Sequence, residues 1–205
     1  MNKGIIFDLD GTLWDAVEEI TQSWNLELEE HSQITTRITK EEMQAYMGKT
    51  MDKFTALFPE IEQEEAIELL ERCCIRENSY LEIHPGRLYP RELETLTQLK
   101  ENNPLFIVSN CHSGYIEAYQ QAYHLKELFQ DIECFGSTGK QKAENIRIVM
   151  ERNHITEAIY IGDTQGDYQA AKEAGVKFIH AAYGFGKVPE AEESVGSIEE
   201  LIHIL

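Results

Sequence analysis

Acidic side chains stand at two places where an apolar segment of the chain gives way to a polar turn. Asp8 and Asp10 follow the first apolar segment, and Asp163 follows a later one, with Asp167 four positions further on. Carboxylates brought to one point repel one another unless a cation lies among them. Hard oxygen ligands suit Mg²⁺, which keeps several waters and accepts a phosphate oxygen of a substrate. These acids therefore predict a magnesium site that handles phosphorylated compounds.

A hydroxyl group and an ammonium group complete this set. Ser109 and Asn110 follow the apolar residues 105–108, and Lys142 begins an amphipathic segment. A serine hydroxyl and a lysine bind phosphate oxygens, and of two neighbouring carboxylates one can be a nucleophile while the other transfers protons. Lys140 is a rival for the lysine position, and we favour Lys142 because it lies at the start of the predicted helix.

The spacing of apolar residues predicts the elements that must position these groups. The predicted strands are 4–7, 105–108, 132–135, 158–161 and 178–181. The predicted helices are 15–31, 40–47, 50–57, 62–80, 93–99, 116–123, 142–152, 167–173 and 198–205. Strands that alternate with helices form right-handed βαβ units and a parallel sheet. The carboxyl ends of its strands share one edge, where ligands bind in such folds.

The predicted strands come from two separated parts of the chain. Residues 1–15 and 85–205 contain all of them, whereas residues 16–84 are predicted to be helical. We therefore expect an α/β protein in which a Rossmann-like core with a parallel sheet is interrupted, directly after its first strand, by an α-helical insertion.

The overall charge narrows the range of partners. The 205 residues carry 37 acidic and 18 basic side chains, which gives a formal charge of −19. Nucleic acids and anionic membrane surfaces require clustered Lys and Arg, so we expect neither as a partner. No apolar run approaches the ~20 residues of a membrane helix, and the N-terminus lacks the pattern of a signal peptide. Four cysteines without metal-ligand spacing fit the reducing cytoplasm.

Four segments resemble the motifs of the haloacid dehalogenase-like (HAD) hydrolases, in the same order and at similar separations. Residues 7–13 resemble the DxDGT signature, and residues 108–110 resemble the second motif, a Ser or Thr at a strand end. Lys142 resembles the third motif, and residues 162–167 resemble the fourth, GDxxxD. The resemblance covers essentially the whole chain and implies that the insertion 16–84 is a helical cap.

The resemblance also implies a role for each residue that handles the phosphoryl group. Asp8 would be the nucleophile that forms an aspartyl-phosphate. Asp10 would protonate the leaving oxygen and then deprotonate the attacking water. Ser109, Asn110 and Lys142 would hold the phosphoryl group.

The remaining acids belong, by the same resemblance, to a metal site. Asp8, the backbone carbonyl of Asp10, and Asp163 would bind Mg²⁺. Asp167 would act on the metal through a water or through another ligand.

These roles together imply a magnesium-dependent phosphatase similar to the phosphoglycolate phosphatase branch, acting on a small phosphorylated metabolite. One alternative is a phosphosugar mutase of the same family; mutases tend to place an arginine three residues after a cap glycine, where Met51 here follows Gly48. Others are a phosphoacceptor signalling domain, which Asp10 and the insertion 16–84 disfavour, and a catalytically silent acidic interaction protein. The sequence leaves the substrate and the oligomeric state open.

Overall fold

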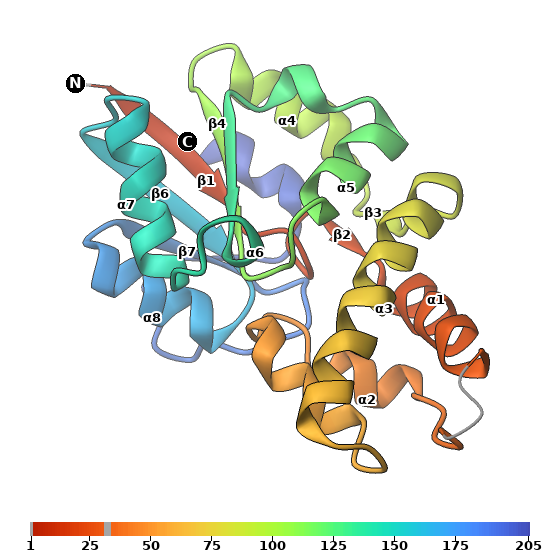
Figure 1. Ribbon diagram of the computed structural model, residues 1–205. Coiled ribbons are helices and arrows are strands. Elements are labelled where there is room, and N and C mark those ends of the chain that lie inside the picture. The colour runs from red at the N-terminus through yellow and green to blue at the C-terminus, as the bar shows by residue number, and fades with distance from the viewer. Residues whose placement is uncertain (1, 31–33) are drawn as a thin grey trace.

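A parallel sheet of six strands forms the centre of the computed structural model, which describes residues 2–30 and 34–205 (Figure 1). The strand order is β5-β4-β1-β6-β7-β8, and all neighbouring pairs are parallel. The strands are β1 (Lys3–Phe7), β4 (Leu105–Ser109), β5 (Asp131–Cys134), β6 (Glu157–Gly162), β7 (Lys177–Ala181) and β8 (Ser194–Val195). The predicted α/β fold with a parallel sheet is therefore confirmed.

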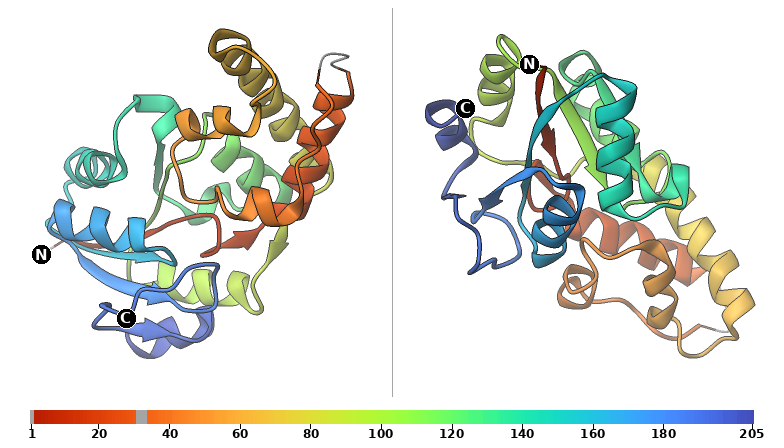
Figure 2. Two further views of the ribbon diagram at one scale, coloured as in Figure 1. Left: turned by 90° about the horizontal axis from the view of Figure 1, so that it is seen from below. Right: turned by 90° about the vertical axis from the view of Figure 1, so that its left-hand side faces the viewer.

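Helices cover both faces of this sheet, because successive residues of a buried strand point to opposite sides. On one face, Ile6 and Val108 share a buried cluster with residues of the helices α7 (Lys142–Arg152) and α8 (Gln165–Ala174). On the other face, Ile5 and Ile107 share a buried cluster with residues of α4 (Glu92–Lys100) and α5 (Tyr115–Tyr123) (Figure 2). The helices are α4 (Glu92–Lys100), α5 (Tyr115–Tyr123), α6 (Phe135–Thr138), α7 (Lys142–Arg152) and α8 (Gln165–Ala174), and the 3-10 helices η2 (Lys126–Leu128) and η3 (Ile198–His203).

Three of the differences from the predicted element boundaries have clear local reasons. Phe135 begins α6 instead of ending a strand, since the chain turns so tightly that a Cβ on Gly136 would lie 2.2 Å from the Ser113 nitrogen. Helix α8 starts at Gln165 because the Thr164 side chain caps it. The predicted helix 198–205 is the 3-10 helix η3, which ends at His203.

Between residues 16 and 84, every regular element in the described residues is a helix. These helices are α1 (Val17–Glu29), α2 (Lys40–Gln44), η1 (Met51–Leu57) and α3 (Gln63–Ile83), and residue 31, the end of a predicted helix, lies outside the described residues. Helix α1 packs against α3, which ends where His84 precedes Pro85, a position that disfavours helical backbone. Figure 1 shows these helices grouped beside the end of the sheet toward which β1 runs. No helix in the described residues is both long and apolar enough to cross a membrane.

A two-stranded antiparallel ribbon connects this helical segment to the sheet. The strand β2 (Trp14–Asp15) pairs with β3 (Arg87–Leu88). Beside the ribbon the two chain segments pass so closely that a Cβ on Gly86 would lie 2.5 Å from that of Ala16. The sequence analysis did not predict this ribbon, because two residues are too few to show the alternation of a strand.

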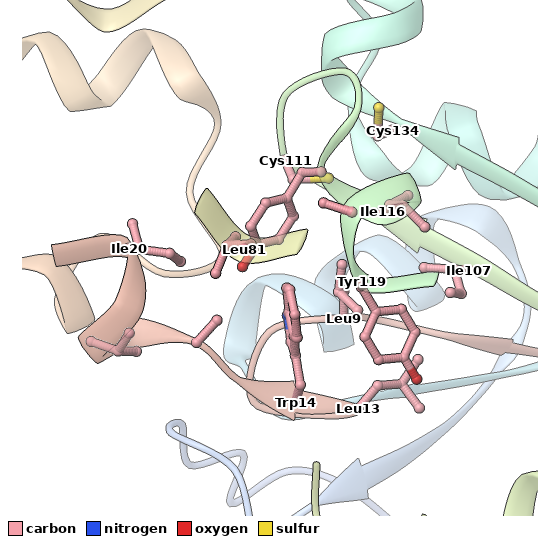
Figure 3. Close-up of a cluster of buried hydrophobic side chains, with 14 of the residues drawn as sticks. Leu9, Leu13, Trp14, Ile20, Leu81, Ile107, Cys111, Ile116, Tyr119 and Cys134 are labelled. Carbon is pink, nitrogen blue, oxygen red and sulfur yellow. The ribbon is translucent and has the colours of Figure 1, made fainter. Parts of the chain in front are cut away.

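Aromatic packing holds the ribbon against α5. The Trp14 side chain is fully buried, and its ring meets those of Tyr119 and Tyr115 edge-on, at centroid distances of 5.1 and 5.4 Å. Figure 3 shows the side chain of Trp14 beside that of Tyr119, with Leu13 below them. Such pairs contribute beyond the buried area alone. The insertion therefore starts from a firmly packed base.

A buried carboxyl group links α4 to α5 on the same face of the sheet. The carboxylate oxygens of Glu92 accept hydrogen bonds from the Tyr119 hydroxyl at 2.8 Å and from the Tyr89 backbone nitrogen at 3.1 Å. Burial raises the pKa of Glu92 to about 8. The folded state therefore keeps the Glu92 carboxyl group protonated up to a higher pH than the unfolded chain does, where the pKa of a glutamate is about 4.3.

This shift predicts a stability effect with a definite sign. As pH rises from about 6 to about 8, ionisation of Glu92 in the unfolded chain should lower the free energy of unfolding by up to about 2 kcal/mol. Glu92→Gln should remove this part of the dependence of the unfolding free energy on pH, because an amide does not ionise. The amide can still accept from the Tyr89 nitrogen and donate to the Tyr119 hydroxyl, so the contacts are kept. Urea unfolding of both proteins at several pH values measures the difference. If the unfolding free energy of both proteins fell equally with pH, the raised pKa of Glu92 would be contradicted.

Candidate active site

Three of the predicted acids converge at the carboxyl ends of β1 and β6. Carboxylate oxygens of Asp8, Asp163 and Asp167 lie within 4.8 Å of one another, and all three residues are buried. The strand register explains this, because Phe7 pairs with Ile161 and the two chains end their strands side by side. The sheet topology thus assembles acids that are far apart in the sequence.

A lysine ammonium lies between two of these acids. Lys142 Nζ donates to Asp8 Oδ1 at 2.8 Å and to Asp167 Oδ1 at 2.5 Å, and its side chain is 4% exposed. Burial acts to lower the pKa of Lys142, but the charges of Asp167 and Asp8 outweigh burial and raise it above its usual range. Lys140 is exposed, with Nζ 4.0 Å from Glu144 Oε1. Of the two rival lysines, Lys142 is the one that reaches the acids.

The donor set around Asp163 fits a hard divalent cation. Its Oδ2 accepts from the backbone nitrogens of Phe185 and Gly186, at 2.7 and 3.2 Å, whereas its Oδ1 is buried without a hydrogen-bond partner in the described part of the chain. Asp8 Oδ2 is likewise buried and unpartnered. Burial, reinforced by the charge of Asp167, raises the pKa of Asp8 and brings that of Asp163 to about 7. A cation bound there would stabilise both ionised forms.

Asp167 is held by the start of its own helix. Thr164 donates to Asp167 Oδ2 from its hydroxyl at 2.6 Å and from its backbone nitrogen at 2.9 Å, and the Asp167 nitrogen donates back to the Thr164 hydroxyl. This reciprocal cap satisfies free donors at the helix start. Since Lys142 occupies Oδ1, both carboxylate oxygens of Asp167 are engaged.

Two glycines let the backbone approach the acids closely. Gly11 has φ +78°, and a Cβ there would lie 2.4 Å from Asp163 Oδ2. A Cβ on Gly184 would lie 2.2 Å from the Gly11 carbonyl oxygen. Only residues without side chains fit this contact. The sequence analysis missed the segment 184–186, although two glycines directly after the predicted strand 178–181 were a signal for it.

Asp10 has a different environment from Asp8. The Tyr115 hydroxyl, from α5, donates to Asp10 Oδ1 at 2.5 Å, and burial raises the pKa of Asp10 to about 6. Its carboxylate does not belong to the group of three converging acids among the described residues. Tyr115 was also missed, since nothing in its local sequence marks it as a partner of Asp10.

The two polar residues at the end of β4 point to different places. Ser109 is buried and lines a cavity together with Asp8 and Asp10. Asn110 donates from Nδ2 to the carbonyl oxygen of Gly48 at 2.9 Å, and its Oδ1 is buried without a partner in the described part of the chain. Asn110 therefore joins the sheet to the helical segment.

The cavity lies between the sheet and the helical segment. Its volume is about 30 Å³, enough for one or two water molecules. The sheet contributes Asp8, Asp10 and Ser109, and the helical segment contributes apolar residues such as Trp24 and Phe54. One wall is thus polar and reactive, and the other is largely apolar.

Comparisons with known proteins agree with this geometry. The family model described as haloacid dehalogenase-like hydrolase matches residues 5–181. A phosphoglycolate phosphatase from Aliivibrio fischeri is 26% identical over 198 residues, covering 89% of this chain and 85% of that protein. A haloacid dehalogenase-like hydrolase from Streptococcus pneumoniae superposes with a TM-score of 0.83 at 20% identity, covering 100% of this chain and 98% of the other. CbbY from Rhodobacter sphaeroides, in complex with xylulose-1,5-bisphosphate, has a TM-score of 0.80 at 18% identity, covering 98% of this chain and 96% of the other.

The position of Lys142 predicts a large difference between the two lysines. Lys142→Met should lower the free energy of unfolding by roughly 3 kcal/mol in metal-free buffer, because it leaves buried carboxylates without their cation. Lys140→Met should change it by less than about 0.5 kcal/mol, as expected for an exposed side chain. Urea denaturation of both variants tests this. Similar losses in the two would show that the buried ammonium does not hold the site together.

Proposed function

We propose a reaction for this chain, which belongs to the haloacid dehalogenase-like hydrolase family and is a phosphatase of its phosphoglycolate phosphatase-like branch. It hydrolyses a small phosphomonoester through an aspartyl-phosphate, with Mg²⁺ as cofactor. The observation that carries the proposal is the state of Asp8. One of its oxygens is fixed by Lys142, and the other is unpartnered in a residue that lines the cavity. A nucleophile needs such a free, oriented oxygen.

In the first step, the Asp8 carboxylate attacks the phosphorus atom through one of its oxygens, and the bond from phosphorus to the leaving oxygen breaks. Asp10 gives its proton to that oxygen. Burial, which raises the pKa of Asp10 to about 6, brings this group near the operating pH, as an efficient acid requires. Ser109 and Lys142 hold the phosphoryl oxygens, and Lys142 also keeps Asp8 in place.

In the second step, water attacks the phosphorus atom of the aspartyl-phosphate. Asp10, now ionised, takes a proton from this water, and the bond from phosphorus to Asp8 breaks to release phosphate. The Tyr115 hydroxyl holds the carboxylate of Asp10 throughout, so that its other oxygen faces the reacting atoms. One carboxyl group thus serves as acid and then as base.

Asp8, Asp163 and the backbone carbonyl of Asp10 would hold Mg²⁺. When bound, Mg²⁺ neutralises negative charge on the phosphoryl oxygens. Asp167 would keep Lys142 oriented and would touch the metal only through water, because both its oxygens already accept hydrogen bonds.

Residues 16–84 would act as a cap that opens and closes over the substrate. The cavity volume of about 30 Å³ is too small for a phosphomonoester, so the walls would separate to admit a substrate. Asn110 holds Gly48, and Asn78 Nδ2 donates to the Ser113 carbonyl oxygen at 3.1 Å, so these two hydrogen bonds would break on opening. The ribbon of β2 and β3 would be the hinge.

The mutase alternative lacks its expected arginine. Met51 lines the cavity, and no arginine is among its described lining residues.

As part of the proposal we place the enzyme in the cytoplasm, since all four of its cysteines are free thiols.

The metal requirement is tested with a chelator. EDTA should abolish turnover of an aryl phosphate, and added Mg²⁺ should restore it. Asp163→Asn should shift the Mg²⁺ concentration needed for half-maximal rate upward by at least about tenfold, since a metal ligand loses its charge. Full activity of the parent in EDTA would refute the proposed cofactor role.

The two carboxylates of the turn are separated by rapid-mix kinetics. An aryl phosphate with a good leaving group hardly needs an acid, but its aspartyl-phosphate still needs a base. Asp10→Asn should therefore release about one equivalent of phenolate per enzyme and then stall, whereas Asp8→Asn should release none. Steady turnover by Asp10→Asn at the parent rate would show that Asp10 is not the base.

A further inference from the structure

The wall contributed by the helical segment carries one buried carboxyl group that the proposed mechanism leaves unused. Glu77 of α3 is 3% exposed and lines the cavity together with Asp8 and Asp10. Its immediate neighbours in that wall are apolar or aromatic, such as Trp24 and Phe54. A carboxyl group in such surroundings costs free energy unless its oxygens find partners.

Only one oxygen of this carboxyl group has a hydrogen-bond partner among the described residues. Trp24 Nε1 donates to Glu77 Oε2. Oε1 lies 4.0 Å from His112 Nε2, which is too far for a hydrogen bond, and that nitrogen instead pairs with Asn78 Oδ1 at 2.9 Å. Among the described residues, Glu77 Oε1 therefore accepts no hydrogen bond.

We propose that Glu77 is a specificity residue that selects phosphomonoesters whose leaving group carries a hydrogen-bond donor, a hydroxyl or an ammonium group, and disfavours those that carry a carboxylate. This inference rests on the proposed function. Asp10 protonates the leaving oxygen, so the rest of the leaving group occupies the space between Asp10 and the helical wall. Glu77 is the acidic group that it meets on that wall.

The charges around the cavity support this choice of ligand. Burial, reinforced by the nearby charge of Asp10, raises the pKa of Glu77 to about 8. At neutral pH the carboxyl group of Glu77 is therefore largely protonated by itself. A donor on the substrate, above all an ammonium group, would stabilise its ionised form, whereas a carboxylate would add a further negative charge beside Asp8 and Asp10. Burial lowers the pKa of His112 to about 4, so it supplies no cation at neutral pH.

One further cation, Lys49, lines the cavity. Its side chain is exposed, and its ammonium lies over the ring of Tyr46, 4.2 Å from the centroid, so this charge is already engaged in a cation–π contact. Lys142 is already bound by Asp8 and Asp167.

A panel of substrates of similar size tests the proposal. It consists of 2-hydroxyethyl phosphate, 2-aminoethyl phosphate, propyl phosphate and 2-phosphoglycolate, each assayed with the full chain and Mg²⁺. For the parent, kcat/KM for the hydroxyl and ammonium substrates should exceed that for the propyl and carboxylate substrates by at least about tenfold. A parent enzyme that uses 2-phosphoglycolate as well as or better than these two would overturn the inference.

Substitution of Glu77 should change this ranking in a defined direction. In Glu77→Gln, the amide oxygen accepts from Trp24, the amide nitrogen donates toward the cavity, and the side chain can no longer ionise to meet a donor on the substrate. The ratio of kcat/KM for 2-aminoethyl phosphate to that for 2-phosphoglycolate should therefore fall by at least about tenfold. Glu92→Gln is the matched control, because Glu92 is also a buried carboxyl with a pKa raised to about 8 but does not line the cavity. Its ratio should equal that of the parent.

An aryl phosphate separates the two ways in which the experiment can fail. If the parent does not hydrolyse p-nitrophenyl phosphate with Mg²⁺, the proposed function fails and the specificity of Glu77 with it. If the parent and Glu77→Gln both hydrolyse it but show the same substrate ratio, only the role of Glu77 is refuted. If Glu77→Gln does not fold, the ranking measured on the parent decides.

Discussion

The pairing of Lys142 with Asp8 and Asp167 is the interaction on which the site depends. Three buried carboxylates within 4.8 Å would repel one another strongly in a medium of low dielectric constant, so they can be held together only if cations lie among them. Lys142 supplies one such charge permanently and leaves room for a second from a bound metal. The three members of the pairing come from β1, α7 and α8, so the ammonium also fixes two helices against the sheet. The hydroxyl of Tyr160 adds to this packing by donating to the Val108 carbonyl oxygen at 2.8 Å.

In the proposed mechanism, the two acids of the first turn have different roles because their surroundings differ. Asp8 lies against a lysine and keeps one oxygen free, which suits a nucleophile. Asp10 lies against the phenol of Tyr115 in a buried setting that favours its protonated form, which suits an acid. Environment rather than residue type separates the functions of paired carboxyl groups in many enzymes. Here the two environments differ because the Asp8 side chain turns toward Lys142 of α7, whereas the Asp10 side chain turns toward Tyr115 of α5.

In the proposed function, the two parts of the chain divide the substrate between them. The sheet would present the groups that act on a phosphoryl group, and these follow the ends of its parallel strands. The helical segment presents Trp24, Glu77 and apolar side chains to whatever the phosphoryl group is attached to. A core of this kind can keep its chemistry while the cap changes its substrate, because the two walls come from separate stretches of chain. The buried packing of Trp14 keeps the walls in register at their junction.

The sequence by itself determined the features that are local in the chain. Asp8 and Asp163 directly follow apolar strands, and the cap formed by Thr164 and Asp167 lies within four residues, so their types and spacing were sufficient to predict a parallel sheet with acids at one edge. The α/β fold followed from the alternation of strands and helices.

Only the tertiary structure decided which distant groups meet these acids. Tyr115 and Glu77 reach the cavity because α5 and α3 pack where they do, and no pattern in their own helices marks them. The backbone nitrogens of Phe185 and Gly186 that hold Asp163 have no side-chain signature at all. The choice between Lys140 and Lys142 depended on which of them the start of α7 turns inward. Such contacts arise from long-range packing, in which the energy of each pairing depends on burial and charge supplied by residues far away in the sequence.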